Sequence, residues 1–187
     1  MYILGTSTLS EIILDIAQCI GMKIDGFFDD FTDETSFYGI PILGGMDSLM
    51  KLKDDSPDAE LFVAVGDNGN REKLFRTIEN NGIILSNVIH PGAYIEPTAV
   101  LGSGNLIMHG AYLGSKVVIG NGNLIFPGVC ITHHNYLGDF NFFSPNVSVG
   151  GHTRFQSGCK IGMNSVVKPY IEIPSNYHCD PLTIVSG

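Results

Sequence analysis

The sequence predicts an α/β unit with a small parallel sheet, followed by a parallel β-helix built from six-residue repeats. Every sixth residue from 89 to 173 is Ile, Leu, Val or Phe, without a break in register. Before these repeats, short apolar runs alternate with segments of helical periodicity. A period of six without a helical stripe is typical of hexapeptide β-helices. We therefore expect two domains, residues 1–86 and residues 87–187.

The hexads predict a coil of three short strands with a corner after each. A hexad supplies a large inward residue such as Ile125, a small inward residue two places earlier such as Asn123, and often a corner glycine such as Gly120. One hexad cannot bury its apolar side alone, so coils stack into a continuous core. Fifteen hexads make five coils of a triangular prism. Residues eighteen apart then lie about 4.8 Å apart, the strand spacing.

The first 86 residues read as three strands that alternate with three helices. This order predicts a parallel sheet with Rossmann-like winding, in which ligands bind at the carboxyl ends of the strands. A loop is expected at residues 32–45. The expected strands are Tyr2–Gly5, Lys23–Phe28 and Glu60–Val65, and the expected helices are Ser10–Ile20, Asp47–Leu52 and Asn70–Asn81.

Polar and small residues follow each of these strands. The first strand leads into Gly5-Thr6-Ser7, the second into Asp29-Asp30 and the third into Gly66-Asp67-Asn68. One glycine stands in the first turn where a dinucleotide fingerprint has three, so we expect no full NAD site. Hydroxyl residues before a helix N-terminus can hold a phosphate, and carboxylates can accept hydrogen bonds from a base or ribose. The alternatives are a plain helix cap and a solvated turn.

Composition narrows the choice of partners. The net charge of −9 argues against a nucleic-acid partner. No basic, apolar leader and no stretch of membrane-spanning length is present, so we expect a cytoplasmic protein without membrane attachment. The four cysteines form no close pair and read as reduced structural thiols.

Two adjacent corner histidines, His133 and His134, stand out from the other histidines. The eighteen-residue stacking rule sets His152 on His134, and Gly151 on His133. A neutral imidazole here can take a proton from an amine or hydroxyl that attacks a thioester, with backbone N–H groups holding the oxyanion.

The chain resembles the bacterial sugar acyltransferases typified by sialic acid O-acetyltransferases and UDP-4-amino-sugar N-acetyltransferases. This resemblance implies a left-handed β-helix, a hand that departs from the usual right-handed crossover. It also implies a homotrimer with acetyl-CoA, or another acyl-CoA, between neighbours, and a nucleotide-linked amino sugar on the N-terminal domain. The motifs that carry it are the strand with Gly5-Thr6-Ser7, Phe27-Phe28-Asp29-Asp30, Val65-Gly66-Asp67-Asn68 with Arg71, Val88-Ile89-His90-Pro91, and the hexads with Ile131-Thr132-His133.

The same resemblance assigns roles to residues. His133 matches the general base of a direct transfer, and Asp29 and Asp30 match residues that meet the nucleotide base. The turn that meets the phosphates matches Gly5, Thr6 and Ser7, and the third strand end matches Gly66 and Asn68. The residues that match positions along the acyl-CoA are Phe142, Ser144, Gly151 and Met163, with the Gly151 N–H as the oxyanion donor. Candidates for binding the phosphates of CoA are Lys168, Lys160 and Arg154.

Three departures fall near the acceptor sugar and the acyl group. His134 stands where the family has an acidic residue that orients the base, and Asp139 is a candidate substitute. Thr8-Leu9-Ser10 replaces a Gly-His-Gly, and Phe142 replaces a second histidine. These changes point to an unusual sugar, a different acyl chain or weakened catalysis.

The interpretation is an acyl-CoA-dependent N-acyltransferase acting on a nucleotide-linked amino sugar in bacterial surface glycan (lipopolysaccharide or capsule) biosynthesis. The alternatives are a sugar O-acetyltransferase of the sialic acid type and a non-catalytic nucleotide-sugar-binding homologue. A metal hydratase needs three converging histidines, and the spacings of His109, His133, His134 and His152 do not match that pattern. No metal is therefore expected.

Overall fold

The computed structural model describes residues 1–186, apart from the side chain at position 55. Contacts along the chain divide it into two compact units, Met1–Val88 and the residues from Ile89 onward. Among the described residues, no helix is both long enough and apolar enough to cross a bilayer.

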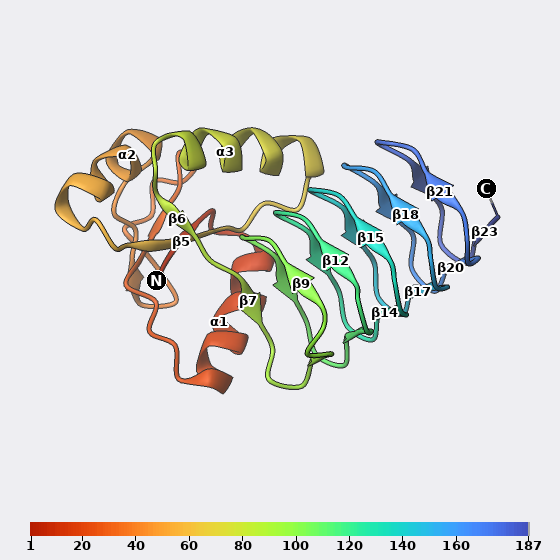
Figure 1. Cartoon of the computed structure of the whole chain (residues 1–187). Helices are drawn as coiled ribbons and strands as arrows, with labels where there is room; N and C mark the ends of the chain where they lie inside the picture. Colours follow the sequence, from red (N-terminus) through yellow and green to blue (C-terminus); the bar gives the residue numbers. More distant parts are fainter. Residues whose placement is uncertain (187) are drawn as a thin grey trace. The chain divides into compact units, whose positions relative to one another are not determined.

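The first unit is a four-stranded parallel sheet between two layers of helix. The strand order is β2-β1-β5-β6. α1 lies on one face and α2 and α3 lie on the other (Figure 1), as right-handed crossovers from β1 to β2 and then back to β5 require. The strands are β1 (Tyr2–Leu4), β2 (Gly26–Phe28), β5 (Glu60–Val63) and β6 (Ile84–Leu85), and the helices are α1 (Thr8–Ile20), α2 (Met46–Asp55) and α3 (Asn68–Asn80).

The sequence prediction for this unit missed a fourth strand of the sheet, β6, and two local predictions were also wrong. The expected loop at residues 32–45 contains an antiparallel hairpin of β3 (Ser36–Phe37) and β4 (Ile40–Pro41). Its two turn residues, Tyr38 and Gly39, have φ of 52° and 78°, the left-handed geometry that two-residue hairpins need. Helix α1 begins two residues earlier than expected, with Ser7 as its N-cap in place of Ser10.

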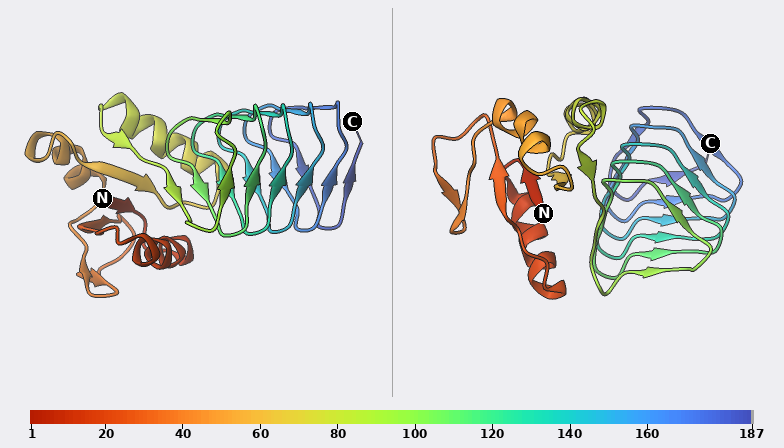
Figure 2. Two further views of the ribbon diagram at one scale, coloured as in Figure 1. Left: turned by 60° about the horizontal axis from the view of Figure 1, so that its bottom comes forward. Right: turned by 60° about the vertical axis from the view of Figure 1, so that its left-hand side comes forward.

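The second unit is a parallel β-helix with two-residue strands, as the hexads predict, and its left hand is the one that the resemblance implies. Its coils stack one upon another (Figure 2), and partners in neighbouring coils are eighteen residues apart. The first sheet holds β7 (Val88–Ile89), β10 (Leu106–Ile107), β13 (Leu124–Ile125), β16 (Phe142–Phe143), β19 (Lys160–Ile161) and β22 (His178–Cys179). The second holds β8 (Tyr94–Ile95), β11 (Tyr112–Leu113), β14 (Cys130–Ile131), β17 (Ser148–Val149), β20 (Val166–Val167) and β23 (Ile184–Val185). The third holds β9 (Val100–Leu101), β12 (Val118–Ile119), β15 (Tyr136–Leu137), β18 (Arg154–Phe155) and β21 (Glu172–Ile173).

Inward side chains of the β-helix form the expected columns. The large residues from Ile107 to Ile173 are buried, and Ile89, Ile95 and Leu101 in the first coil are partly buried. The column continues past Ile173 with Cys179 and Val185. The small inward position holds a buried amide ladder, in which Asn123 N donates to Asn105 Oδ1 at 2.8 Å and Asn141 N donates to Asn123 Oδ1 at 2.9 Å. Buried amides need such partners, so the ladder fixes the register between coils.

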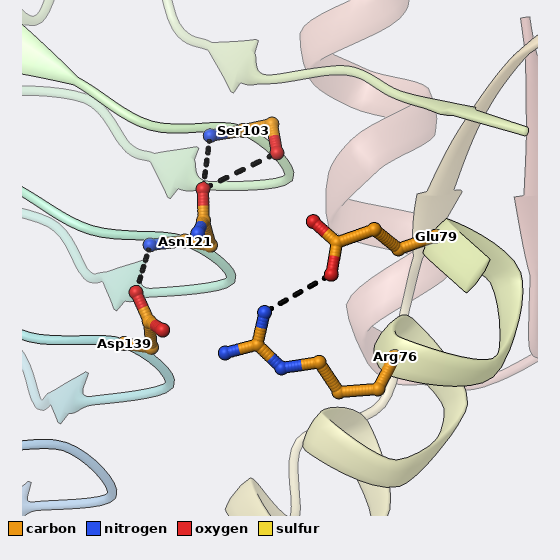
Figure 3. A network of polar contacts seen from close by, with 5 residues as sticks. All are labelled: Arg76, Glu79, Ser103, Asn121 and Asp139. Carbon is orange, nitrogen blue, oxygen red and sulfur yellow. Dashed lines mark hydrogen bonds and ion pairs between the residues drawn. The ribbon is translucent and has the colours of Figure 1, made fainter. Parts of the chain in front are cut away.

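Corner residues also form ladders, one of which appears in Figure 3. Ser103 N donates to Asn121 Oδ1 at 2.9 Å, and Asn121 N donates to Asp139 Oδ1 at 2.7 Å. The same view draws the ion pair between Arg76 and Glu79 on α3, with 3.0 Å between Nη1 and Oε2. The corner ladder gives backbone N–H groups acceptors where no strand pairs with them.

Candidate active site

The carboxyl ends of β1, β2 and β5 enclose a pocket of about 310 Å³ in the first unit. Its lining includes Gly5, Thr6, Ser7, Asp29, Asp30 and Gly66 of the residues singled out in the sequence. The carboxyl ends of parallel strands meet at one edge, and for this reason residues far apart in the sequence come together here. The lining also includes Phe31 and Leu74.

Asp29 ties the first strand end to the second. Its Oδ2 accepts hydrogen bonds from the N–H and hydroxyl of Thr6 at 2.8 and 2.6 Å, and its Oδ1 accepts from Phe31 N at 2.8 Å. Partial burial raises the pKa of Asp29, but the hydrogen bonds from Thr6 and Phe31 outweigh burial and leave the pKa below its usual value. Asp29 is therefore an anion that shapes the pocket wall.

Asp30 lies on the rim of the same pocket and is exposed. Its Oδ1 accepts from Met46 N at 2.9 Å, at the start of α2. The two adjacent carboxylates differ in the number of hydrogen bonds they accept. Asp29 accepts three, from Thr6 and Phe31, and Asp30 accepts the one from Met46 N. Asp30 is thus the more accessible of the two for a ligand in the pocket.

The turn after β1 leads directly into α1. Ser10 Oγ donates to Gly5 O at 2.7 Å, and Ser7 Oγ donates to Ala64 O at 3.1 Å. Ser10 is buried, so it braces the turn from inside. N–H groups at the start of a helix attract anions, and this one opens beside the pocket.

At the third strand end, a buried arginine holds the loop after β5. Arg71 Nη1 donates to the carbonyl oxygens of Val65 and Gly66, both at 3.0 Å, and Nη2 donates to Asn68 Oδ1 at 2.7 Å. Burial lowers the pKa of Arg71 to about 10, so it stays protonated at neutral pH. The Asn68 side chain is therefore engaged with Arg71. Of Gly66 and Asn68, the two residues expected at this strand end, Gly66 lines the pocket.

In the second unit, the candidate base lies at the corner after β14. Asn135 fixes this corner, because its Nδ2 donates to Thr132 O at 3.1 Å and its Oδ1 accepts from Thr153 N at 2.7 Å in the next coil. His133 and His134 are exposed on this corner. The distance between His133 Nδ1 and His134 Nδ1 is 3.2 Å, so one nitrogen donates to the other.

A column of left-handed residues runs beside His133 over four coils. Lys116, His134, His152 and Tyr170 have φ of 59°, 58°, 59° and 61°. The rings of His134 and His152 are stacked with centroids 4.8 Å apart, and those of His152 and Tyr170 with centroids 4.9 Å apart. Loss of hydration, and then nearby charge on His152, Lys116 and His133, lower the pKa of His134 below its usual value.

Gly151 lies against the face of His133. A Cβ on Gly151 would lie 2.5 Å from His133 Cε1 and 2.9 Å from Nε2, so only glycine leaves room for the ring. The Gly151 N–H donates to no acceptor among the described residues. The roles of His133 as base and of the Gly151 N–H as oxyanion donor stay predictions.

The residues expected along the acyl-CoA divide between two corners of one chain. Phe142, Ser144 and Met163 gather at the corner between β16 and β17 and its equivalent in the next coil. Lys168 follows β20, beside Gly150, whose N–H donates to Val167 O at 2.9 Å. One side of the prism, six residues or about 20 Å at full extension, separates the two corners.

Asp139 does not lie at the His133 corner. It follows β15, one side of the prism further on, where its Oδ1 accepts from Asn121 N. The side chain that contacts the candidate base is that of His134, through Nδ1.

Three of the candidate histidines come together in one chain. Each of His133, His134 and His152 offers a ring nitrogen, and these atoms all lie within 4.8 Å of one another. The sequence spacings argued against a hydratase pattern, whereas the present group forms within one chain, because coil stacking joins residues eighteen positions apart. Three imidazoles at this spacing are a donor set that suits zinc and its neighbours in the transition series.

Residues 1–78 match the family model of the PglD N-terminal domain. Among curated proteins, the uncharacterized protein L142 of Acanthamoeba polyphaga mimivirus is 34% identical over 105 residues. That match covers 56% of this chain, and the chain spans about a fifth (20%) of the length of this relative.

Solved structures match nearly the whole chain. The acetyltransferase domain of PglB from Neisseria gonorrhoeae FA1090 gives a TM-score of 0.89 at 24% identity, over 99% of this chain and 90% of that chain. The same domain in complex with acetyl coenzyme A gives 0.86 at 24% identity, over 98% and 91%. A mutant of perosamine N-acetyltransferase from Caulobacter crescentus, in complex with CoA and GDP-perosamine, gives 0.70 at 25% identity, over 96% and 92%.

These likenesses agree with the resemblance drawn from the motifs. An α/β unit that precedes a left-handed parallel β-helix is the fold that the chain shares with these structures. Residues 1–78 are thus similar to the PglD N-terminal domain, and the whole chain shares the fold of these solved structures.

Proposed function

We propose that the protein is an acyl-CoA-dependent N-acyltransferase that acts on a nucleotide-linked amino sugar, with acetyl-CoA as the first donor to test. The observation that best supports this proposal is the setting of His133. Its imidazole is exposed, contacts His134 through Nδ1 and lies against Gly151. The complexes of similar proteins with acetyl coenzyme A, CoA and GDP-perosamine support the two substrate classes.

The chemistry follows from the tautomer of His133. When His133 Nδ1–H donates to His134 Nδ1, the lone pair on His133 Nε2 is free to take a proton. The sugar amine attacks the thioester carbonyl while His133 accepts the amine proton. The Gly151 N–H stabilises the oxyanion, and collapse of the tetrahedral intermediate breaks the carbon–sulfur bond. The departing CoA thiolate takes the proton from His133, which leaves an amide and free CoA.

The acceptor nucleotide belongs in the strand-end pocket of the first unit. The N-terminus of α1 and the turn Gly5–Ser7 suit the phosphates, because their N–H groups favour anions. Asp30 is exposed on the rim and suits hydrogen-bond donors of the base or ribose. Asp29 and Arg71 shape the walls through their own hydrogen bonds, as described above.

The division of the donor residues between corners supports the homotrimer that the resemblance implies. An acyl-CoA that contacts Phe142 and Met163 of one copy and His133 of the next requires two corners from different copies to face each other. Phe142 stacks on Phe126 with centroids 4.7 Å apart, and Lys160 Nζ lies 5.4 Å from the Phe142 centroid. This apolar wall beside a cation suits a pantetheine arm with a phosphate near it.

The first test of the substrates is thermal unfolding with acetyl-CoA, UDP, GDP and dTDP, each alone. A ligand that binds the folded state raises the melting temperature by mass action. We expect a rise with acetyl-CoA and with one nucleotide. Asp30→Asn should remove the nucleotide effect alone. No rise with any ligand would overturn the proposed sites.

A non-catalytic nucleotide-sugar-binding protein is the second candidate, and His134 in place of an acidic residue favours it. That protein would bind the nucleotide without releasing CoA. An O-acyltransferase, in turn, would release CoA with a hydroxyl acceptor and not with an amine. An acceptor series with matched amino and hydroxyl sugars separates these cases.

A further inference from the structure

Three imidazoles meet at one outer corner of the β-helix. Their ring nitrogens lie within 4.8 Å of one another, and all three side chains are exposed. Stacking of successive coils produces the group, because His152 N donates to His133 O at 3.2 Å across the two corners. The group lies wholly within the second unit.

We propose that His133, His134 and His152 bind one divalent transition-metal ion, of which Zn²⁺ is the probe. Three neutral imidazoles with one position left to water are a common tetrahedral arrangement for zinc. The site contains no carboxylate, so nitrogen donors define its preference, and hard cations such as Mg²⁺ are disfavoured.

The spacing of the nitrogens suits such an ion. Zinc–nitrogen bonds of about 2.0–2.1 Å place tetrahedral ligand atoms about 3.3 Å apart. His133 Nδ1 and His134 Nδ1 are already 3.2 Å apart. The remaining nitrogen pairs, within 4.8 Å, need to close by about 1.5 Å at most, which exposed imidazoles achieve by rotation about χ1 and χ2.

The backbone holds the three residues in position before any ion binds. His134 and His152 share the left-handed conformation, with φ of 58° and 59°, so their side chains leave the helix in the same direction. His134 N donates to Ser115 O at 2.9 Å, which anchors its corner to the preceding coil. Lys116 is exposed one coil before His134 and is the neighbouring charge that opposes a cation.

Metal binding has a consequence for the reaction, and this consequence rests on the proposed function. The base needs a free lone pair on His133, and an ion bound to this imidazole removes one nitrogen from hydrogen bonding and brings positive charge to the site. Bound Zn²⁺ and acyl transfer are therefore expected to exclude each other, so the ion acts as an inhibitor that a chelator reverses.

Isothermal titration calorimetry of the full chain with Zn²⁺ tests the site without any substrate. After removal of metal with EDTA, we expect one Zn²⁺ per chain. His152→Asn should weaken binding at least tenfold, since asparagine adopts the left-handed conformation but removes the imidazole. His178→Ala is the matched control, because His178 is exposed on the same β-helix outside the group, and it should leave binding unchanged. Mg²⁺ should give no saturable heat.

Absence of saturable Zn²⁺ binding would overturn the proposal, and so would equal affinity in the His152→Asn variant. His134→Asn is a second variant with the same expectation, and superimposable melting curves in EDTA show that each variant is folded. Because calorimetry uses no substrate, its failure is distinct from the failure of acyl transfer, which CoA release measures with and without EDTA.

Discussion

The imidazole rings of His134 and His152 lie face to face, with centroids 4.8 Å apart and planes inclined by 14°. Tyr170 continues the stack below His152, with planes 6° apart. The stack restrains the His134 ring, and the same ring contacts His133 through Nδ1. The coil geometry thus fixes the neighbour of the proposed base through residues far along the sequence.

Replacing His134 by an acidic residue should increase activity. In the proposed mechanism His133 becomes positively charged during transfer, and in His134→Glu a carboxylate would stabilise that charge. Exposed ion pairs contribute about 1 kcal/mol or less, so we expect a rise in kcat of up to about fivefold. Steady-state CoA release measures it, with His134→Gln as the uncharged control. Equal kcat in the two variants would show that charge on this neighbour does not matter.

Acid should destabilise the protein partly through His134. Its pKa is lowered in the folded state, so the unfolded chain binds the proton more readily. Stability is therefore complete above the unfolded pKa of about 6.5 and falls as the pH drops through the lowered folded value. Between pH 7.5 and pH 5.5, the melting temperature of His134→Asn should fall by less than that of the parent protein. An identical loss in both proteins would contradict this assignment.

Gly151→Ala should impair catalysis with little effect on folding. The added Cβ would lie 2.5 Å from His133 Cε1, so the imidazole must move away. A displacement of about 1 Å at a reacting group costs on the order of a hundredfold in rate. CoA release and thermal unfolding are measured together. Gly69→Ala, whose Cβ would meet nothing closer than 3.6 Å, controls for an added methyl group. Parental activity in Gly151→Ala would mean that the position of His133 tolerates a shift.

The amide ladder inside the β-helix should be important for stability. Asn123 Oδ1 accepts from Asn141 N at 2.9 Å, and Asn123 is fully buried. Asn123→Leu leaves the backbone N–H of Asn141 without this acceptor, at a cost of about 1–3 kcal/mol. Denaturant unfolding measures the loss, and Asn164→Gly is the control, because Asn164 is at an exposed corner with φ of 57°, a conformation that glycine adopts without strain. A loss no larger than that of the control would show that the ladder is dispensable.

The β-helix was largely predictable from the sequence, because each hexad repeats the same inward pattern. Ile125 and Asn123 could be assigned from period alone, and the stacking of His152 on His134 followed from the eighteen-residue rule. The left hand came from the resemblance, since no local pattern distinguishes the two senses of winding.

Other features depend on contacts that the sequence does not display. The Ser7 cap was missed because Ser10, the expected cap, is instead buried and bonded to Gly5 O. Asn68 was expected in the pocket, but its side chain accepts from the buried Arg71. Phe31 was overlooked although it directly follows Asp29-Asp30, and its side chain is 98% exposed beside the pocket. The spacings of the histidines were compared only with a hydratase pattern, so the group of His133, His134 and His152 within one chain was not expected.

CoA release by the parent and by His133→Asn, with acetyl-CoA and an amino-sugar nucleotide, tests the central claim most directly. We expect the parent to release CoA only when the acceptor is present. The variant should lose about 10²–10⁴-fold in kcat, the usual contribution of a general base. It should still show the thermal shift with each ligand. Undiminished CoA release by His133→Asn would contradict the assignment of His133 as the base.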